Sequence, residues 1–397
     1  MPSSPTATAA SLAANARPRR DPRIDVLRGL ALFMIFIDHI PDNVLSLATM
    51  HNFGFCDAAE LFVLLSGMSA MLAYGGAFER RGAWHGLRQI SRRWAWLYVF
   101  QLGLLAATLL IVWLWTSYYG FQPRIVGPFL DDPFAGVLHG LTLSAVPTYL
   151  DILPLYLALF AVFPLIYAGL RVSRLLTLAF SAALWAAANL VPALNLPNWA
   201  NGGQWFFNPF AWQFLFTIGA AIAMLLAAHD GQLPRARWAV WVCAAFLLFA
   251  LVETVPWSAW HLPDPRPIAL ASPDQTNLAP LRLVDILALA YLLLSSPTFR
   301  AIAGARVLWP LDLCGRHSLE VFATGCVVAL FGRLLFRTYG AGLPLQIAVN
   351  AIGFLAMWGV AFYLDRTRAS TAGAASHAPQ PELNHQDIGT TARGERN

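Results

Sequence analysis

A basic pair inside an apolar run is the first place where this sequence could do chemistry. Ten residues separate Arg28 from His39 in RGLALFMIFIDH. On a helix the two lie roughly 16 Å apart, about half the thickness of a bilayer core. Histidine can accept a proton from a hydroxyl near neutral pH, so His39 is a candidate general base for acyl transfer. The alternative is a core histidine bonded to a carbonyl. Asp38 and Asp42 favour the functional interpretation, because Asp42 is three residues on and could orient the ring.

Carboxylates near the ends of apolar runs are the second set of candidates. Asp57 and Glu60 have the spacing of a capping box at a helix N-terminus, and either could also partner His39. Asp151, in TYLDILPLYLALF, is either a helix cap or part of an acceptor site. No zinc-type spacing of cysteine and histidine is found, so we expect no metal. The candidate catalytic residues are therefore His39, Asp57, Glu60 and Asp151.

Arginines form the third set. Arg92 and Arg93 precede an apolar run, where they are either ordinary positive charge beside a membrane or a clamp for phosphate oxygens. Arg316 is four residues from both Asp312 and Glu320, a spacing that predicts an ion-pair ladder along one helix. A charge inside a membrane costs roughly 2.5–3.5 kcal/mol, so such residues usually face a partner or a substrate. The candidate substrate-binding residues are Arg28, Arg92, Arg93, Asp38 and Arg316.

Composition places these residues in a membrane protein. The 397 residues are 58% hydrophobic and only 12% charged, and the mean hydropathy is +0.56. Soluble domains are about 25% charged. The net charge of +5 comes entirely from arginine, because the chain contains no lysine. No basic stripe is interleaved with aromatic residues in a polar segment, so nucleic-acid binding is not expected. The composition instead predicts that the protein lies in a lipid bilayer.

Hydropathy predicts an all-α, polytopic membrane bundle of about ten transmembrane helices. The arginine-rich loops near 78–93, 170–174, 229–237 and 299–306 alternate with longer loops that are poor in arginine, which predicts that both termini are cytoplasmic. We expect a disordered tail over 1–22, a transmembrane domain over 23–365 and a second disordered tail over 366–397. The predicted spans are 27–46, 58–77, 94–116, 148–169, 174–194, 208–228, 236–254, 281–298, 307–331 and 344–365.

Four segments resemble a known family. RIDVLRGLALFMIFIDHIP, FGFCDAAELFVLLSG, DILPLYLALF and GRHSLEVF are similar to segments of the OpgC-type membrane succinyltransferases, which modify osmoregulated periplasmic glucans and belong with the acyltransferase-3 group. The resemblance implies a multi-pass enzyme of a bacterial inner membrane that takes an acyl group from acyl-CoA, with succinyl-CoA favoured, and has no permanently bound cofactor. It implies that Arg28, Arg92 and Arg93 lie near the donor phosphates. His39 would be the general base or transient acyl acceptor for a glucan hydroxyl.

Two other functions stay open at this point. The same machinery could transfer acetyl groups to another envelope polysaccharide. A proton-coupled transporter would also use intramembrane Asp, Glu and His side chains.

Overall fold

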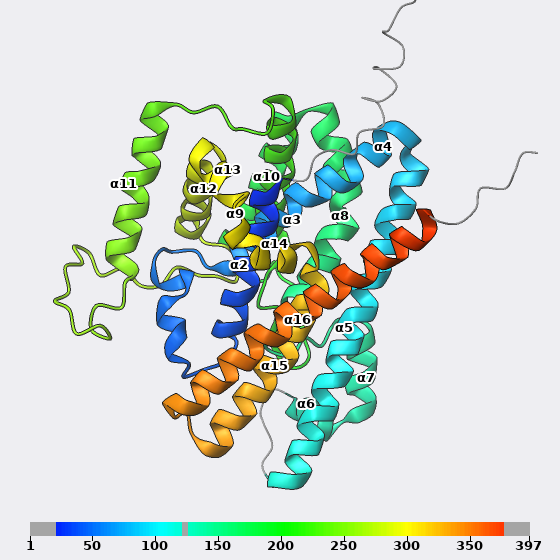
Figure 1. Ribbon diagram of the computed structural model, residues 1–397, viewed down its shortest axis with the longest axis vertical. Helices are drawn as coiled ribbons and strands as arrows, with labels where there is room; N and C mark the ends of the chain where they lie inside the picture. Colours follow the sequence, from blue (N-terminus) through cyan, green and yellow to red (C-terminus); the bar gives the residue numbers. More distant parts are fainter. Residues whose placement is uncertain (1–20, 121–125, 377–397) are drawn as a thin grey trace, which may run out of the picture.

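The chain folds into a bundle of helices with one short β-hairpin (Figure 1). The computed structural model describes residues 21–120 and 126–376 and is 75% helical. The α-helices are α2 (Pro22–Asp38), α3 (Ala58–Ala70), α4 (Gly76–Arg81), α5 (Ala83–Tyr119), α6 (Gly127–Asp131), α7 (Pro133–Leu141), α8 (Ile152–Val172), α9 (Arg174–Leu190), α10 (Pro209–Ala228), α11 (Arg237–Thr254), α12 (Pro280–Leu294), α13 (Pro297–Ala303), α14 (Trp309–Arg316), α15 (Ser318–Tyr339) and α16 (Leu343–Ser376). The short elements are η1 (Val44–Ala48), η2 (Met50–Asn52), the π-turn η3 (Met71–Gly75), η4 (Arg306–Leu308), β1 (Pro197–Asn198) and β2 (Gly203–Gln204).

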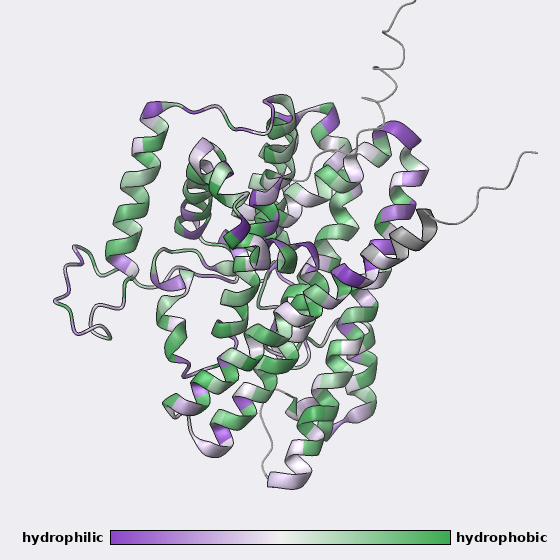
Figure 2. Ribbon diagram, in the orientation of Figure 1, coloured by the Kyte–Doolittle hydropathy of each residue, from purple (hydrophilic) through white to green (hydrophobic). Residues whose placement is uncertain are grey.

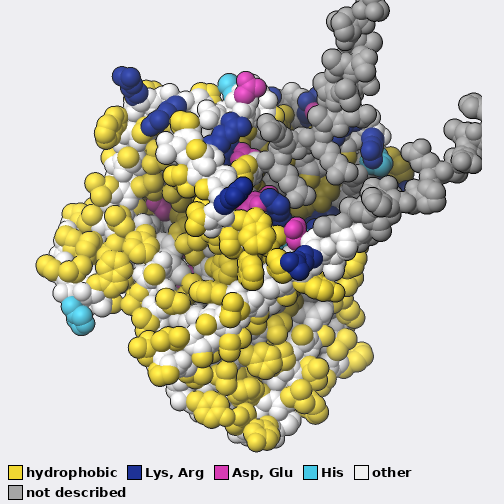
Figure 3. Space-filling view, in the orientation of Figure 1, with side chains coloured by type: hydrophobic (Ala, Val, Ile, Leu, Met, Phe, Trp, Pro, Cys, Tyr) yellow, Lys and Arg dark blue, Asp and Glu magenta, His cyan; other side chains and the backbone are white. Residues whose placement is uncertain are grey.

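Apolar helices dominate the described residues. Seven of them are long and apolar enough to cross a membrane, or up to eight if the bent pair α12 and α13 counts as one span. Most of the residues along these helices are hydrophobic (Figure 2). On the face seen in Figure 3, charged side chains gather toward the upper end and hydrophobic ones cover the lower half. The predicted class, an all-helical multi-pass membrane protein, is therefore confirmed, whereas ten spans are not supported.

Two predicted spans are shorter than expected. The span predicted at 27–46 is α2, which ends at Asp38, three residues before Pro41, and is followed by a loop and η1. Proline disfavours helical backbone in the residue before it, so the run of apolar residues extends further than the helix. The span predicted at 174–194 is α9, with 17 residues.

Two other predicted spans are broken. The segment 281–298 bends by 81° between α12 and α13. At that break Pro297 has no backbone N–H and so cannot donate a hydrogen bond to the preceding turn. Ser296 caps the new helix, because its hydroxyl oxygen accepts a hydrogen bond from Phe299 N at 3.2 Å. The segment 307–331 is divided at His317 into α14 and α15. Of the predicted ladder, the ion pair of Arg316 with Asp312 is formed. Glu320 lies 3.8 Å from Arg368 instead of pairing with Arg316.

The N-terminus of α2 is firmly anchored. Asp21 caps the helix by accepting from Arg23 N at 3.1 Å, and Pro22 occupies the first helical position. The Arg23 side chain is fully buried and donates to the carbonyl oxygen of Leu294 at 2.9 Å. These bonds join the start of α2 to the end of α12.

Glycines let two helix pairs approach closely around the centre of the bundle. A Cβ atom on Gly29 would overlap the carbonyl oxygen of Leu311, which lies in α14. A Cβ atom on Gly67 would overlap a carbonyl of α10, and one on Gly219 would overlap the carbonyl of Leu64 in α3. Small residues allow such contact, and close packing is what holds helices together in lipid. The packing of α2 on α14 and of α3 on α10 therefore depends on these glycines.

The close approach of α3 and α10 predicts the outcome of two matched substitutions. Gly219→Ala should lower the free energy of unfolding by about 1–3 kcal/mol, because the new methyl group forces two backbones apart. Gly103→Ala, in α5, has nothing within 4 Å of its Cβ position. It should be neutral or stabilising by up to about 1 kcal/mol, because alanine favours the helix. Thermal unfolding of both variants in one detergent tests this, and equal effects would contradict it.

Candidate functional site

Arg28 and His39 lie at two levels of the same helix. Arg28 is in the second turn of α2 and donates to the Ser69 hydroxyl, with a further bond to Asp25 at 3.3 Å. His39 is the residue that ends the helix. At 1.5 Å per residue their backbones are roughly 16 Å apart, as the sequence predicts. Each residue lines a different cavity.

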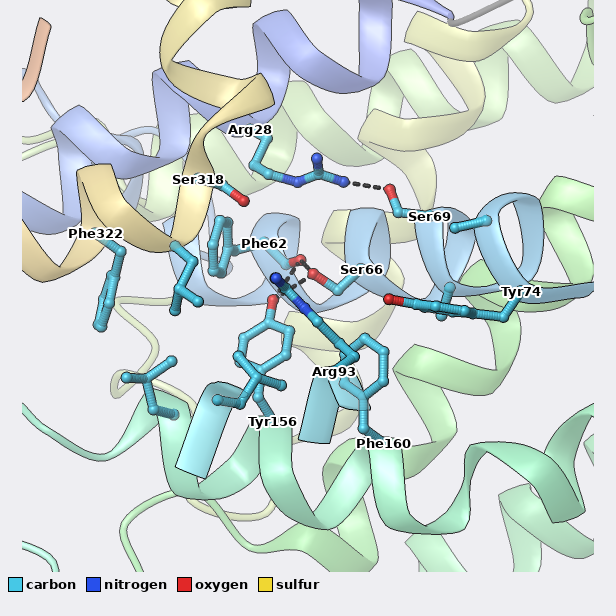
Figure 4. Close-up of a pocket in the computed structure, with 15 residues that line it drawn as sticks. Arg28, Phe62, Ser66, Ser69, Tyr74, Arg93, Tyr156, Phe160, Ser318 and Phe322 are labelled. Carbon is cyan, nitrogen blue, oxygen red and sulfur yellow. Dashed lines mark hydrogen bonds between the residues drawn. The ribbon is translucent and has the colours of Figure 1, made fainter. Parts of the chain in front are cut away.

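The arginine cavity, of about 140 Å³, contains two of the predicted donor-binding residues. Arg28 from α2 and Arg93 from α5 reach toward it from opposite sides of the view in Figure 4. Ser69 from α3 lies beside Arg28, whereas Ser66 from α3 and Tyr156 from α8 lie next to the tip of Arg93 in this view (Figure 4). Two guanidinium groups and several hydroxyls around one space are suited to binding phosphate or carbonyl oxygens.

Tyr156 and Ser66 are fixed in this cavity by one shared acceptor. The backbone oxygen of Phe62 lies 3.0 Å from the Tyr156 hydroxyl and 2.8 Å from the Ser66 hydroxyl, and the two hydroxyl groups are within hydrogen-bond distance of each other. Since each hydroxyl has one hydrogen, one of them donates to Phe62 while the other donates to its neighbour. Neither residue was a sequence candidate, because a serine or tyrosine in an apolar helix is an ordinary occurrence.

The histidine cavity, of about 220 Å³, brings together four predicted residues. His39 and Asp38 come from the end of α2, Asp57 from the start of α3, and Asp151 from the start of α8. Tyr149 completes the wall beside His39, with ring centroids 5.1 Å apart in an edge-to-face arrangement. An imidazole and three carboxyl groups facing one space can accept, hold and return a proton.

Asp42 does not take the role of orienting His39. Its backbone has a φ of 62°, its side chain is exposed, and no hydrogen bond joins it to the His39 ring within 21–120 and 126–376. The chain turns away at Pro41, so the three-residue spacing is no longer helical. Instead, Tyr149 packs on the ring, and Arg333 donates to the His39 carbonyl oxygen at 3.3 Å.

Asp57 and Glu60 form the predicted capping box. Asp57 accepts from Ala59 N at 2.7 Å, and Glu60 accepts from Asp57 N at 3.0 Å. Arg282 of α12 bonds to Glu60 at 2.6 Å and to Asp57 at 3.0 Å. Glu60 is fully buried and lines neither cavity, whereas Asp57 faces the histidine cavity. Glu60 is thus placed to hold Arg282, and only Asp57 is placed to act near His39.

Arg92 and Arg316 lie outside both cavities. Arg92 is exposed beside Arg93, because neighbouring residues on a helix point in different directions. Arg316 forms its ion pair with Asp312 on the same helix. Arg333, which was not a sequence candidate, is also an arginine within an apolar helix, so the cost of a buried charge was the signal that could have found it.

A third, more polar cavity of about 520 Å³ opens beside the histidine cavity. The two share Asp57 and Gln275, and Gln275 donates to the Asp57 carboxylate at 2.5 Å. Glu253 accepts from Ile268 N at 3.2 Å and from Leu270 N at 3.0 Å, which fixes the long loop after α11 as one wall. We call this space the vestibule.

His51 lies between the vestibule and Asp38. Its Nδ1 is 3.4 Å from the Asp38 carboxylate, and Thr49 donates to the same carboxylate at 2.7 Å. The hydrogen bond with Asp38 raises the pKa of His51 above its ordinary value. Asp38 is therefore connected through His51 to the vestibule while it also lines the histidine cavity.

The fold and these cavities define a multi-pass helical membrane protein with polar groups gathered inside an apolar bundle. The family model described as OpgC protein matches residues 20–369, so the chain belongs to the OpgC protein family. Membership points to a glucan-modifying acyltransferase in general. A search of curated proteins finds no match.

The buried charge cluster predicts a large loss of stability when its cation is removed. Arg282→Met should lower the free energy of unfolding by about 3–5 kcal/mol, because Asp57 and Glu60 are left buried without a counter-charge. Adding Glu60→Gln should recover part of that loss, since one of the two carboxylates is then neutral. Thermal or denaturant unfolding of the single and double variants measures both effects. A double variant less stable than the single one would contradict this account.

The His51–Asp38 contact predicts a pH-dependent contribution to stability. Because the pKa of His51 is raised in the folded protein, protonation favours the folded state. Its contribution is complete below the unfolded pKa of about 6.5 and is lost as the pH rises through the folded pKa. The difference in Tm between wild type and His51→Gln should therefore be larger at about pH 5.5 than at about pH 8.5. Asp38→Asn should remove the same pH dependence, and a difference that grows at alkaline pH would contradict the assignment.

Proposed function

We propose that this protein is a membrane O-acyltransferase that moves an acyl group, succinyl from succinyl-CoA, to hydroxyl groups of a periplasmic glucan. The observation that carries the proposal is the placement of two cavities at two levels of α2, one with the side chains of Arg28 and Arg93 in its wall and the other with that of His39. Such an arrangement suits a reaction whose donor and acceptor come from opposite sides of a membrane. The match to the OpgC protein family supports it.

The donor is proposed to bind at the arginine cavity. Arg28 and Arg93 would bind phosphate oxygens of acyl-CoA, with the exposed Arg92 nearby as additional positive charge. The hydroxyl groups of Ser66 and Tyr156 are placed to bond to the polar groups of the pantetheine arm. In this proposal the arginine-rich loops and both termini face the cytoplasm of a bacterium, and the protein lies in the inner membrane.

The acceptor is proposed to enter through the vestibule. A sugar is rich in hydroxyl groups, and the vestibule offers carboxylate, amide and guanidinium partners in Asp57, Gln275 and Arg282. Phe53 precedes Gly54, which lines the vestibule, and its ring centroid lies 5.8 Å from that of Trp260. Aromatic faces suit the apolar face of a sugar ring. The shared wall at Asp57 then leads the hydroxyl to the histidine cavity.

His39 is proposed to activate the acceptor. Its ring takes the hydroxyl proton while the hydroxyl oxygen attacks the acyl carbonyl carbon; the new C–O bond forms and the C–S bond breaks, and the thiolate of CoA leaves and takes up a proton. Because roughly 16 Å separate Arg28 from His39, the acyl group must cross between the cavities. It crosses on the pantetheine arm. At His39 it passes directly to the hydroxyl, or it first forms a transient acyl-histidine, in which the ring nitrogen displaces the CoA thiolate and the glucan hydroxyl then displaces the ring nitrogen. Asp38, Asp57 and Asp151 are placed to stabilise the charged imidazole.

The proposal predicts different kinetic effects at the two cavities. His39→Gln should lower kcat by about 100-fold or more, because the general base is lost. Arg93→Ala should raise KM for the acyl-CoA by about 10-fold with a smaller change in kcat, since a charged contact to the donor is lost. Transfer of radiolabelled acyl groups to glucan by the purified protein in nanodiscs measures both. Arg174→Ala, an exposed arginine at the start of α9, is the matched control and should leave both constants unchanged.

The same assay decides between this function and its rivals. Unchanged transfer by His39→Gln would refute the role of His39. Transfer from acetyl-CoA but not from succinyl-CoA would establish an acetyltransferase. Proton flux into liposomes that depends on the substrate and needs no acyl donor, together with no acyl transfer, would establish a transporter.

A further inference from the structure

His51 is a histidine that lines the vestibule and has no role in the proposed reaction so far. It lies in η2, and its side chain is 42% exposed, so a molecule in the vestibule can reach it. The vestibule shares Asp57 and Gln275 with the histidine cavity. Asp38 lines the histidine cavity and also contacts His51. His51 and His39 therefore line two cavities with a common wall, on the route proposed for the acceptor.

Three neighbours fix the orientation and the tautomer of the His51 ring. Thr49 donates its hydroxyl hydrogen to Asp38 at 2.7 Å, so its oxygen is left to accept from Nδ1 of His51, 3.0 Å away. The Asp38 carboxylate, 3.4 Å from the same nitrogen, also favours a hydrogen there. On the other side of the ring, the Asn52 amide nitrogen donates to the Ser46 carbonyl oxygen at 2.7 Å and lies 2.8 Å from Nε2. The hydrogen of the neutral ring is therefore on Nδ1, and Nε2 has the free lone pair.

This arrangement is the one that a general base requires. A carboxylate beside Nδ1 holds the imidazole in one orientation and stabilises the charge that the ring gains when Nε2 takes a proton. The hydrogen bond with Asp38 also raises the pKa of His51. At Nε2 the Asn52 amide is on the exposed side of the ring, where an incoming hydroxyl group can take its place. The charged groups around His51 come from several elements: Asp38 of α2, Asp57 at the start of α3, Glu253 of α11, Arg266 of the following loop and Arg282 of α12.

An acyl-histidine route needs a second base in addition to His39. When a ring nitrogen of His39 is bonded to the acyl carbon, its lone pair is no longer free to take the proton of the acceptor. A second group must then take that proton. The histidines among the described residues that line the histidine cavity and the vestibule are His39 and His51.

We propose that His51 is the general base that takes the proton of the acceptor hydroxyl, and that Asp38 and Thr49 position its ring. The inference rests on the proposed acyltransferase function and selects its acyl-histidine route. It assigns one histidine to each of two steps: His39 is the nucleophile of the first, and His51 is the base of the second.

The two steps balance as follows. In the first, a ring nitrogen of His39 attacks the acyl carbon, a C–N bond forms, the C–S bond breaks, and the CoA thiolate takes up a proton from water. In the second, the acceptor oxygen attacks that carbon, a C–O bond forms, and the C–N bond breaks. The electron pair of the C–N bond returns to His39, whose other nitrogen keeps its hydrogen throughout. His51 takes the hydroxyl proton, directly or through one water, and releases it to water in the vestibule.

The first experiment separates the two steps. The purified full-length protein in nanodiscs is mixed with succinyl-CoA, with and without a glucose oligosaccharide, at about pH 8.5, where protonation of His51 contributes least to stability. His51→Gln should release CoA in a burst equal to the amount of protein and gain the mass of one acyl group. Its turnover with the acceptor should fall by about 100-fold or more. His39→Gln should show no burst, and His229→Gln, an exposed histidine at the end of α10, should match the wild type.

Each other outcome of this experiment has a defined meaning. Wild-type turnover in His51→Gln would overturn the role of His51 and leave the acyltransferase intact. Loss of the burst together with the turnover would indicate that His51 only supports the structure around His39, and that result would also overturn the proposal. No transfer by the wild type from any acyl-CoA would instead refute the proposed function.

The second experiment changes Asp38 and follows the second step alone, by adding the acceptor to the acylated protein. Because His51 acts in its neutral form, the rate should rise as the pH increases through its folded pKa, which Asp38 raises. Asp38→Asn should move this rise to lower pH, whereas Asp42→Asn, an exposed aspartate in the next turn, should leave it in place. A rise that does not move in Asp38→Asn would overturn the assignment. This measurement decides the question if His51→Gln does not fold.

Discussion

The arrangement of the site depends on one buried cluster, Arg282 between Asp57 and Glu60. In an apolar bundle, separating these three charges would leave each of them unpaired, at a cost of several kcal/mol. The cluster therefore fixes the start of α3 against α12. It also fixes the Asp57 carboxylate in the wall that the histidine cavity shares with the vestibule. A structural ion pair and a candidate reaction site thus use the same side chain.

Around this cluster, α2 connects the two halves of the proposed reaction. Its N-terminus is anchored through the buried Arg23, and glycine-mediated contact with α14 holds its middle in place. A helix fixed at both levels keeps Arg28 and His39 at a constant separation. A donor at one level and an acceptor at the other can then react across a membrane without large movements of the chain. In the proposed reaction, the two small cavities would admit the acyl group and its pantetheine arm rather than the whole donor.

Electrostatics divides the arginines of this chain into two groups. Some, such as Arg92, are exposed on the outside of the bundle. Three others have defined partners inside the bundle: carboxylates for Arg282, hydroxyl and carboxylate groups for Arg28, and an aromatic ring and a carbonyl for Arg333.

Local rules predict the helical membrane class, the capping box at Asp57 and Glu60, and the separation of Arg28 from His39. These rules are hydropathy over one helix length, cap spacing and the rise per residue. They place helix ends wrongly at Pro41, Pro297 and His317, because apolar composition continues through such breaks. Which charges meet depends on the packing of helices that are distant in the chain. Asp57 and Arg282 are 225 residues apart, and His39 and Arg333 are 294 residues apart. Partners so distant in the chain are chosen by how the helices pack, and no local pattern records that choice.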